Sequence, residues 1–248
     1  MQTFASFDGQ SIAWSEVGSG HPVVLIHGLF SDARTNWIKF GTAAAIAAAG
    51  FRVITPDLRG HGASAHPHDA AAYPADVLAR DIAALISHLG LTDFDLGGYS
   101  LGARTTMRCL TRGMAPRRVV LAGMGLAGLI EVNRRTAWFL NVIAAPDGFA
   151  RGSPGWTAAQ FMRTTGVDTA AVAHVLRSQV EMARADLAAA TMPALVVCGA
   201  DDVDNGSAPE LAAALASATY AEIPGTHMSS VTKPELGMAI GAFLAGQR

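Results

Sequence analysis

Short, largely apolar runs recur along the chain, and a stretch with a helical pattern follows most of them. The runs at residues 23–26, 52–55, 118–121 and 194–198 are rich in β-branched side chains. Such runs are typical of strands that are buried on both faces, as in a parallel sheet. Their alternation with helices predicts an α/β fold with a doubly wound, mostly parallel sheet and flanking helices.

The turn residues between these runs allow individual elements to be predicted. Two β-prone segments around Asp8-Gly9 predict a hairpin of residues 3–7 and 10–17. Further strands are expected at 23–26, 52–55, 94–99, 118–121, 194–198 and 219–223. Helices are expected at 32–49, 74–89, 101–111 and 231–244.

Residues 125–190 interrupt this alternation. They have no strand pattern, but they contain helical runs at 131–143, 158–164 and 169–189. Five large aromatic side chains also lie here: Trp138, Phe139, Phe149, Trp156 and Phe161. We therefore expect one α/β core, formed by residues 1–124 and 191–248, and a helical cap insertion at 125–190 that covers one end of the sheet.

Charge and composition restrict the possible partners. The net charge is −2 and the pI is about 6.4, which provides no basic surface for nucleic acid or anionic lipid. The apolar runs are shorter than a membrane span, and the first residues lack a signal-peptide pattern. Cys109 and Cys198 are expected to be buried free thiols. We expect a cytoplasmic protein that acts on a small molecule, with no nucleic-acid or membrane partner and no cofactor.

Gly98-Tyr99-Ser100-Leu101-Gly102 matches the pattern G-x-S-x-G, at the junction of a predicted strand and a predicted helix. In this context the serine occupies a sharp, strained turn, and its hydroxyl projects above the sheet near the positive end of the helix. The two glycines allow close packing of neighbouring elements around the turn. Ser100 is therefore the candidate nucleophile.

A serine hydroxyl needs a general base to become a good nucleophile. We select His227, because it lies in the loop between the last strand and the last helix, at the same sheet edge as Ser100. His21 precedes a strand at the opposite edge, and His88 and His174 lie within predicted helices. His66 and His68 belong to a polar loop without further clustered ligands, so no metal site is expected.

The base in turn needs a carboxylate that orients it and stabilises its protonated form. Asp201, Asp202 and Asp204 follow the predicted strand at 194–198. The order serine, aspartate, histidine along the chain suits the nucleophile-turn motif. We take Asp202 as the acid, with Asp201 and Asp204 as the alternatives.

Backbone amides are expected to stabilise the negative oxygen of a tetrahedral intermediate. The amide of Leu29 follows His27-Gly28 at the end of a predicted strand, and the amide of Leu101 begins the helix after Ser100. Phe30, Tyr99 and Met228 could line an apolar substrate pocket, although ordinary core packing explains large apolar side chains equally well.

Five segments in chain order together resemble the α/β-hydrolase family, in its small esterase-like branch that carries a cap. They are residues 23–28 (V-V-L-I-H-G), 57–64 (D-L-R-G-H-G-A-S), 98–102 (G-Y-S-L-G), 199–202 (G-A-D-D) and 224–227 (P-G-T-H). The resemblance implies that Asp202 is the acid and that residues 125–190 form the variable cap. It also implies that loop 57–64 is chiefly structural, so that Arg59 and His61 take no part in the chemistry.

The resemblance also bears on the type of reaction. Family members that act on epoxides or haloalkanes use an aspartate where this chain has Ser100. C–C bond hydrolases carry a Ser-Gly-Pro-Gly run after the histidine that corresponds to His27, and this chain lacks it. We expect a serine hydrolase that cleaves a carboxylic ester through an acyl-enzyme. The alternatives are a ligand sensor with negligible turnover and an acyltransferase or perhydrolase that uses the same residues.

Overall fold

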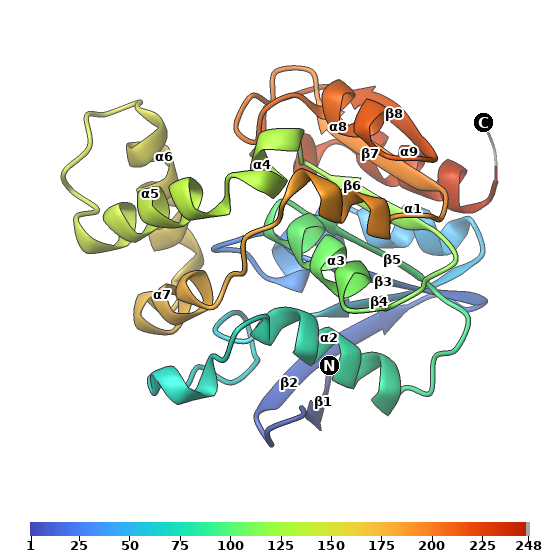
Figure 1. The fold of residues 1–248 in the computed structure, drawn as a ribbon, viewed down its shortest axis with the longest axis horizontal. Helices are drawn as coiled ribbons and strands as arrows, with labels where there is room; N and C mark the ends of the chain where they lie inside the picture. The colour runs from blue at the N-terminus through green and yellow to red at the C-terminus, as the bar shows by residue number, and fades with distance from the viewer. Residues whose placement is uncertain (247–248) are drawn as a thin grey trace.

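In the computed structural model, which describes residues 1–246, eight strands form one sheet in the order β1-β2-β4-β3-β5-β6-β7-β8 (Figure 1). The hairpin strands β1 and β2 run antiparallel to each other, and β2 runs antiparallel to β4. All other neighbouring pairs are parallel, as predicted. The strands are β1 Gln2–Ala5, β2 Ser11–Val17, β3 His21–Ile26, β4 Phe51–Pro56, β5 Asp95–Tyr99, β6 Val119–Ala122, β7 Ala194–Gly199 and β8 Ala218–Ile223.

Helices cover both faces of the sheet. On one face lie α1 (Thr42–Ala48) and α9 (Pro234–Leu244); on the other lie α2 (Val77–His88), α3 (Leu101–Thr111) and α8 (Ala208–Ala214). Along β3, Val23 and Leu25 pack with α1 and α9, whereas Val24 and Ile26 pack with α2. Because both sets are buried, the strand sequence is continuously apolar instead of alternating.

The prediction of one helix over residues 32–49 was wrong. The chain forms a single π-helical turn, η1 (Arg34–Ile38), and then α1, with Gly41 between them. Gly41 adopts φ +85°, a left-handed conformation that favours glycine and breaks the helix. The π-helical turn buries Trp37 and Asn36, and Asn36 becomes important at the site described below.

Three other predicted helices are shorter than the sequence suggested. Helix α7 (Thr169–Arg177) ends before Ser178, whose carbonyl accepts a hydrogen bond from the Asp76 amide, and residues 184–189 form a 3-10 turn, η3. Helix α2 begins only at Val77, because Asp76 before it has φ +59°. Both oxygens of the Asp76 carboxylate accept hydrogen bonds from Arg108 of α3, at 2.8 and 2.6 Å. Helix α9 begins at Pro234, not at Val231.

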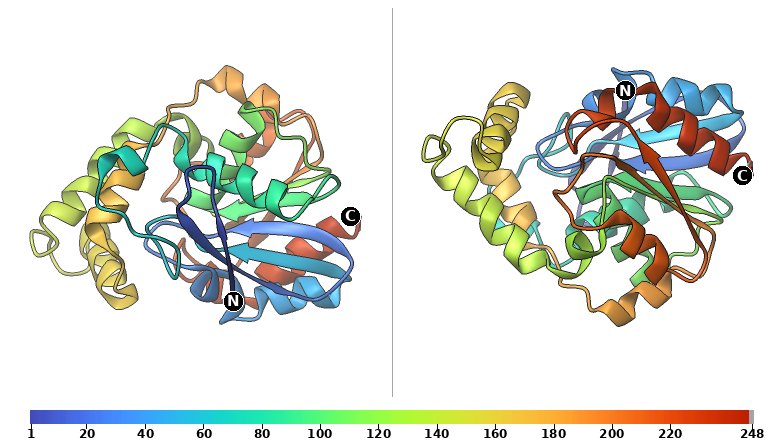
Figure 2. Two further views of the ribbon diagram at one scale, coloured as in Figure 1. Left: turned by 90° about the horizontal axis from the view of Figure 1, so that it is seen from below. Right: turned by 90° about the horizontal axis from the view of Figure 1, so that it is seen from above.

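All the regular secondary structure between β6 and β7 is helical. It comprises α4 (Leu126–Ile130), α5 (Val132–Ala144), α6 (Pro154–Thr165), α7 and η3. In both views of Figure 2, α5, α6 and α7 project to one side of the sheet. Phe30, which follows β3, packs with apolar side chains of these helices and meets the ring of Phe139 edge-on, at 5.6 Å between centroids. Phe30 therefore connects the sheet to this helical segment, the predicted cap.

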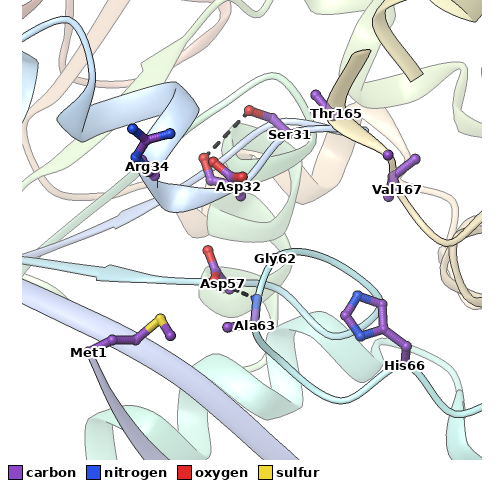
Figure 3. A pocket seen from close by; sticks show the side chains of 11 residues that line it. Met1, Ser31, Asp32, Arg34, Asp57, Gly62, Ala63, His66, Thr165 and Val167 are labelled. Carbon is purple, nitrogen blue, oxygen red and sulfur yellow. Dashed lines mark hydrogen bonds between the residues drawn. The ribbon is translucent and has the colours of Figure 1, made fainter. Parts of the chain in front are cut away.

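A cavity of about 340 Å³ lies at the seam between core and cap (Figure 3). Its walls come mainly from the segment after β3, from loop 57–64 and from the end of α6, with Met1 and His66 in addition. The lining residues are Met1, Ser31, Asp32, Arg34, Asp57, Gly62, Ala63, His66, Thr165, Gly166 and Val167. The lining includes none of the predicted catalytic residues. Among the described residues, no helix combines the length and the apolar character that a bilayer crossing requires.

Candidate active site

The predicted catalytic residues come from three of the parallel strands. Ser100 directly follows β5, Asp202 lies in the loop after β7, and His227 lies in the loop after β8. The loop with His27 and Gly28 follows β3, which neighbours β5. Because these strands are parallel, their carboxyl ends meet at one edge of the sheet, where ligands bind in folds of this type.

Ser100 occupies a strained turn between β5 and α3, with φ 54° and ψ −109°. The close packing of its neighbours explains how the strain is maintained. A Cβ on Gly98 would lie 2.3 Å from the Gly102 carbonyl carbon, and a Cβ on Gly102 would lie 2.0 Å from the Ile26 carbonyl oxygen. Such distances leave no room for a side chain, so both glycines are required for the turn. Backbone strain of this kind costs about 1–3 kcal/mol and is typical of functional sites.

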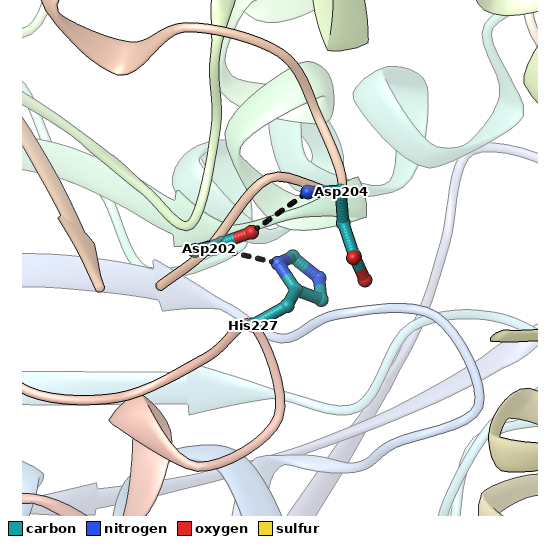
Figure 4. A group of neighbouring side chains, drawn as sticks. All are labelled: Asp202, Asp204 and His227. Atoms are coloured by element: carbon teal, nitrogen blue, oxygen red, sulfur yellow. Dashed lines mark hydrogen bonds and ion pairs between the residues drawn. The ribbon is translucent and has the colours of Figure 1, made fainter. Parts of the chain in front are cut away.

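The three predicted residues meet. His227 Nε2 lies 3.1 Å from Ser100 Oγ, and His227 Nδ1 lies 2.8 Å from Asp202 Oδ2. Figure 4 shows the imidazole facing the Asp202 carboxylate. The Asp202 side chain is 1% exposed and the His227 side chain 13% exposed. The imidazole therefore lies between a hydroxyl and a buried carboxylate, which is the arrangement that activates a serine.

Asp202 is held in its ionised form by its hydrogen bonds. Burial of the carboxyl opposes ionisation, but the hydrogen bond and charge of His227 outweigh this effect, so that the pKa of Asp202 lies below its usual value. The Asp204 amide at 3.1 Å and the Cys198 thiol at 3.3 Å also donate to this carboxylate. Burial and the nearby Asp202 raise the pKa of Cys198, which keeps the thiol protonated as a donor.

The two alternative acids occupy different positions. Asp201 is exposed, and its amide donates to the Gly225 carbonyl. The Asp204 carboxylate lies within 4.8 Å of ligand atoms of both Asp202 and His227, a spacing that could also suit a metal ion. However, the two nitrogens of His227 face Asp202 and Ser100, which is the geometry of a base and not of a metal ligand.

The loop after β3 is fixed by two buried side chains. His27 Nε2 accepts a hydrogen bond from the Leu58 amide at 2.9 Å, so Nδ1 carries the hydrogen and donates to the Gly28 carbonyl at 2.8 Å. Burial lowers the pKa of His27, which favours this neutral form. Asn36 Oδ1 accepts from the Gly28 amide at 2.9 Å. A Cβ on Gly28 would lie 3.6 Å from that of Ser100, so this loop lies directly against the nucleophile turn.

Within residues 1–246, neither the Leu29 amide nor the Leu101 amide donates a hydrogen bond to another protein group. The Leu101 amide belongs to the first turn of α3, where backbone donors have no partner in the helix. Both amides are therefore available to a ligand next to Ser100. This availability is what an oxyanion-binding pair requires, and the assignment stays a prediction.

The predicted substrate-lining residues have three different environments. Phe30 is 2% exposed and packs between core and cap, whereas Met228 is 39% exposed. Tyr99 is 3% exposed, and its hydroxyl donates to the His227 carbonyl at 2.6 Å. Tyr99 thus helps to fix the backbone of the loop that carries His227. Contact of any of the three with a substrate stays a prediction.

Loop 57–64 is rich in internal contacts. The Asp57 carboxylate accepts hydrogen bonds from the Ala33 and Ala63 amides, each at 2.8 Å. The buried guanidinium of Arg59 binds the carboxylates of Asp8 and Asp81. These contacts connect the loop to the N-terminal hairpin and to α2, as expected of the structural role that the family resemblance implied.

Several residues that support the site were not predicted from the sequence to do so. They are Asn36, which holds the Gly28 amide, Tyr99 in its contact with His227, and Arg135 of the cap, which donates to the Asp204 carbonyl. Asn36 lies in a segment that was predicted to be a regular helix, and Arg135 is 69 residues from its partner. Neither has a local sequence signal that indicates its partner.

The mostly parallel sheet with its flanking helices and the arrangement of serine, histidine and aspartate at one sheet edge are those of an α/β hydrolase. Residues 23–236 match the model of the alpha/beta hydrolase family, which is more than half of the chain. This chain therefore belongs to the alpha/beta hydrolase family.

Individual relatives are similar over part of their length. A non-heme haloperoxidase from Rhodococcus erythropolis is 38% identical over 123 residues, which cover 47% of this chain and 41% of that protein. A dihydrolipoyllysine-residue acetyltransferase component of an acetoin cleaving system from Pseudomonas putida is 36% identical over 130 residues, 51% of this chain and 33% of that protein. The matches thus span less than half the length of these relatives.

Among solved structures, an esterase from Exiguobacterium antarcticum superimposes with a TM-score of 0.76. The alignment covers 98% of each chain at 20% sequence identity. At this identity the likeness shows the shared fold.

Proposed function

We propose that this protein is a serine hydrolase that cleaves a carboxylic ester of a small, fairly apolar substrate through an acyl-enzyme. One observation carries the proposal: Ser100 Oγ, His227 and Asp202 are joined by contacts of 3.1 and 2.8 Å. The strained turn at Ser100 and the free amides of Leu29 and Leu101 support it.

In the proposed first half-reaction, Ser100 Oγ attacks the ester carbonyl carbon while its proton passes to His227 Nε2. The carbonyl oxygen becomes negative and accepts hydrogen bonds from the Leu29 and Leu101 amides. Asp202 stabilises the imidazolium that forms. The carbon–oxygen bond to the alcohol then breaks, and His227 returns the proton to the leaving alcohol.

In the second half-reaction, a water molecule attacks the acyl-enzyme. His227 Nε2 removes a proton from the water and gives it to Ser100 Oγ as the acid leaves. The enzyme regains its starting state, and no cofactor takes part. The apolar side chains of Phe30 and the cap are suitable neighbours for an apolar acyl or alcohol group.

The test is hydrolysis of a short and a medium-chain p-nitrophenyl ester by the purified protein and by Ser100→Ala. We expect turnover that the substitution lowers by about 10³-fold or more, because the nucleophile is lost while the fold is kept. Activity that survives Ser100→Ala would contradict the proposed mechanism. Absence of turnover in the unaltered protein would instead favour the ligand-sensor alternative.

Transfer of the acyl group to an acceptor other than water is the second candidate. The relatives named as a haloperoxidase and as an acetyltransferase component favour it. The same acyl-enzyme would be attacked by hydrogen peroxide, an alcohol or a thiol in place of water. If each acceptor is added to the ester assay, a new acyl product that forms faster than the free acid would support transfer.

A further inference from the structure

Arg135, on helix α5 of the cap, donates a hydrogen bond through Nη1 to the backbone carbonyl of Asp204. Its side chain is partly buried, and its guanidinium carbon lies 5.3 Å from the centre of the Phe139 ring. Among the ion pairs of residues 1–246, none involves Arg135. The side chain is thus directed at the loop after β7 without a carboxylate partner of its own.

From Asp204 the contacts continue to the nucleophile. The Asp204 amide donates to Asp202 Oδ1 at 3.1 Å, and the other oxygen of this carboxylate contacts His227 Nδ1 at 2.8 Å (Figure 4). His227 Nε2 then lies 3.1 Å from Ser100 Oγ. An unbroken series of hydrogen-bonding contacts therefore leads from the cap to the predicted nucleophile.

We infer that Arg135 is a positioning residue that couples the cap to the catalytic aspartate and histidine through Asp204. The inference rests on the proposed function of Ser100, His227 and Asp202. Arg135 fixes the backbone of Asp204, Asp204 fixes one oxygen of Asp202, and the orientation of His227 follows. A residue of the cap thereby helps to orient His227 toward Ser100.

The positive charge of Arg135 also lies near the carboxylates of Asp204 and Asp202. The groups around the His227 imidazole are the carboxylates of Asp202 and Asp204, the hydroxyl of Ser100 and the ring of Tyr99 at 5.3 Å between centroids. The Tyr99 hydroxyl contacts the backbone carbonyl of His227. Burial lowers the pKa of Arg135, while the nearby Asp204 and Asp202 oppose this change. A positive charge here disfavours a second one on the imidazole. Removal of the charge should therefore move the acid limb of the pH–rate profile to higher pH.

The chain offers a matched control on the same helix. Arg134 is 77% exposed and pairs with Glu131 on the surface, at 2.6 Å. Arg134→Met removes the same charge and the same functional group from the adjacent position. Surface pairs of this kind contribute little, so the control should retain the activity and the pH profile of the unaltered protein.

The experiment compares kcat, KM and the pH–rate profile of p-nitrophenyl ester hydrolysis for Arg135→Met, Arg135→Lys and Arg134→Met. For Arg135→Met we expect kcat to fall about 10-fold, with little change in KM, because a hydrogen bond to a positioning loop is lost. We also expect the acid limb to move to higher pH, whereas Arg134→Met should leave it in place. Arg135→Lys keeps the charge, so it should restore the position of the acid limb and part of the rate.

The inference is overturned if Arg135→Met has the pH–rate profile of Arg134→Met, even when its melting temperature falls, because a purely structural contact would lower stability alone. Should Arg135→Met fail to fold, Arg135→Gln removes the charge while keeping a donor and decides the same question. If the unaltered protein hydrolyses no ester, the proposed function fails separately. An NMR titration of the His227 ring in the unaltered protein and in Arg135→Met then still tests the coupling, since equal midpoints would refute it.

Discussion

The nucleophile turn and the cap approach the same sheet edge, but they are held there by different means. At the turn, Gly98 and Gly102 have no space for a Cβ, so the backbone is fixed by steric exclusion. The cap is attached through side chains: Phe30 packs against Phe139, and His68 Nε2 lies 2.8 Å from Asp168 Oδ2 on the surface. Side-chain contacts can be exchanged for others, whereas the space at the glycines cannot be enlarged. The difference predicts that the turn tolerates almost no change and that the cap tolerates many.

The largest effect should come from a methyl group at the nucleophile turn. In Gly102→Ala the new Cβ would lie 2.0 Å from the Ile26 carbonyl oxygen, so α3 or β3 must shift. We expect loss of ester turnover and a destabilisation of about 3 kcal/mol or more in chemical denaturation. Gly113→Ala is the control, because it has open space and only its φ of +90° opposes alanine, at a cost of about 1–2 kcal/mol. Equal effects of the two substitutions would refute the steric account.

The next largest effect should distinguish Asp202 from Asp201 as the catalytic acid. Asp202→Asn keeps the volume but removes the charge that orients His227, so we expect kcat/KM to fall by about 10³-fold. Asp201→Asn changes an exposed neighbour and should leave kcat/KM unchanged. If instead Asp201→Asn abolished activity and Asp202→Asn did not, the acid would be misassigned.

A smaller loss of activity should follow from a substitution that releases the loop after β3. In Asn36→Ala the acceptor for the Gly28 amide is lost, and the Leu29 amide is no longer held in place. Steady-state kinetics should show a decrease in kcat of about 10-fold to 10²-fold, because oxyanion donors act mainly in the transition state. Asn133→Ala removes an exposed contact to Glu181 within the cap and should leave kcat unchanged. A change in KM with kcat unchanged in Asn36→Ala would argue against a role of this residue in holding the oxyanion donors.

The smallest effect should come from the cap. Phe139, which is only partly buried, makes an edge-on contact with the buried Phe30, and Phe139→Ala removes this contact. We expect a loss of about 1–2 kcal/mol in thermal unfolding and a higher KM for medium-chain esters, with kcat retained. A collapse of kcat comparable to that of Gly102→Ala would contradict the distinction between the two regions.

The same distinction explains what the sequence could predict. The sheet, the nucleophile turn and the candidate acid and base follow from local patterns: apolar runs, glycines at fixed spacing and polar residues after strands. Asn36 and Arg135 act through partners that are remote in the chain, Gly28 and Asp204, and no local pattern identifies such pairs. The helix predicted over 32–49 failed for a local reason: the alanine-rich composition favours a helix, but Gly41 within the segment adopts a left-handed conformation that interrupts it.

The central claim is that Ser100 forms a covalent acyl-enzyme. The most direct measurement is the mass of the intact protein, quenched with acid within the first turnovers of a p-nitrophenyl ester, followed by peptide mapping. We predict that the protein gains the mass of one acyl group and that the acyl group lies on the peptide that contains Ser100. In Asp202→Asn, a larger fraction of the protein should be acylated if deacylation slows more than acylation. An acyl group on another residue, or hydrolysis with no acylated protein in either the unaltered chain or this variant, would contradict it.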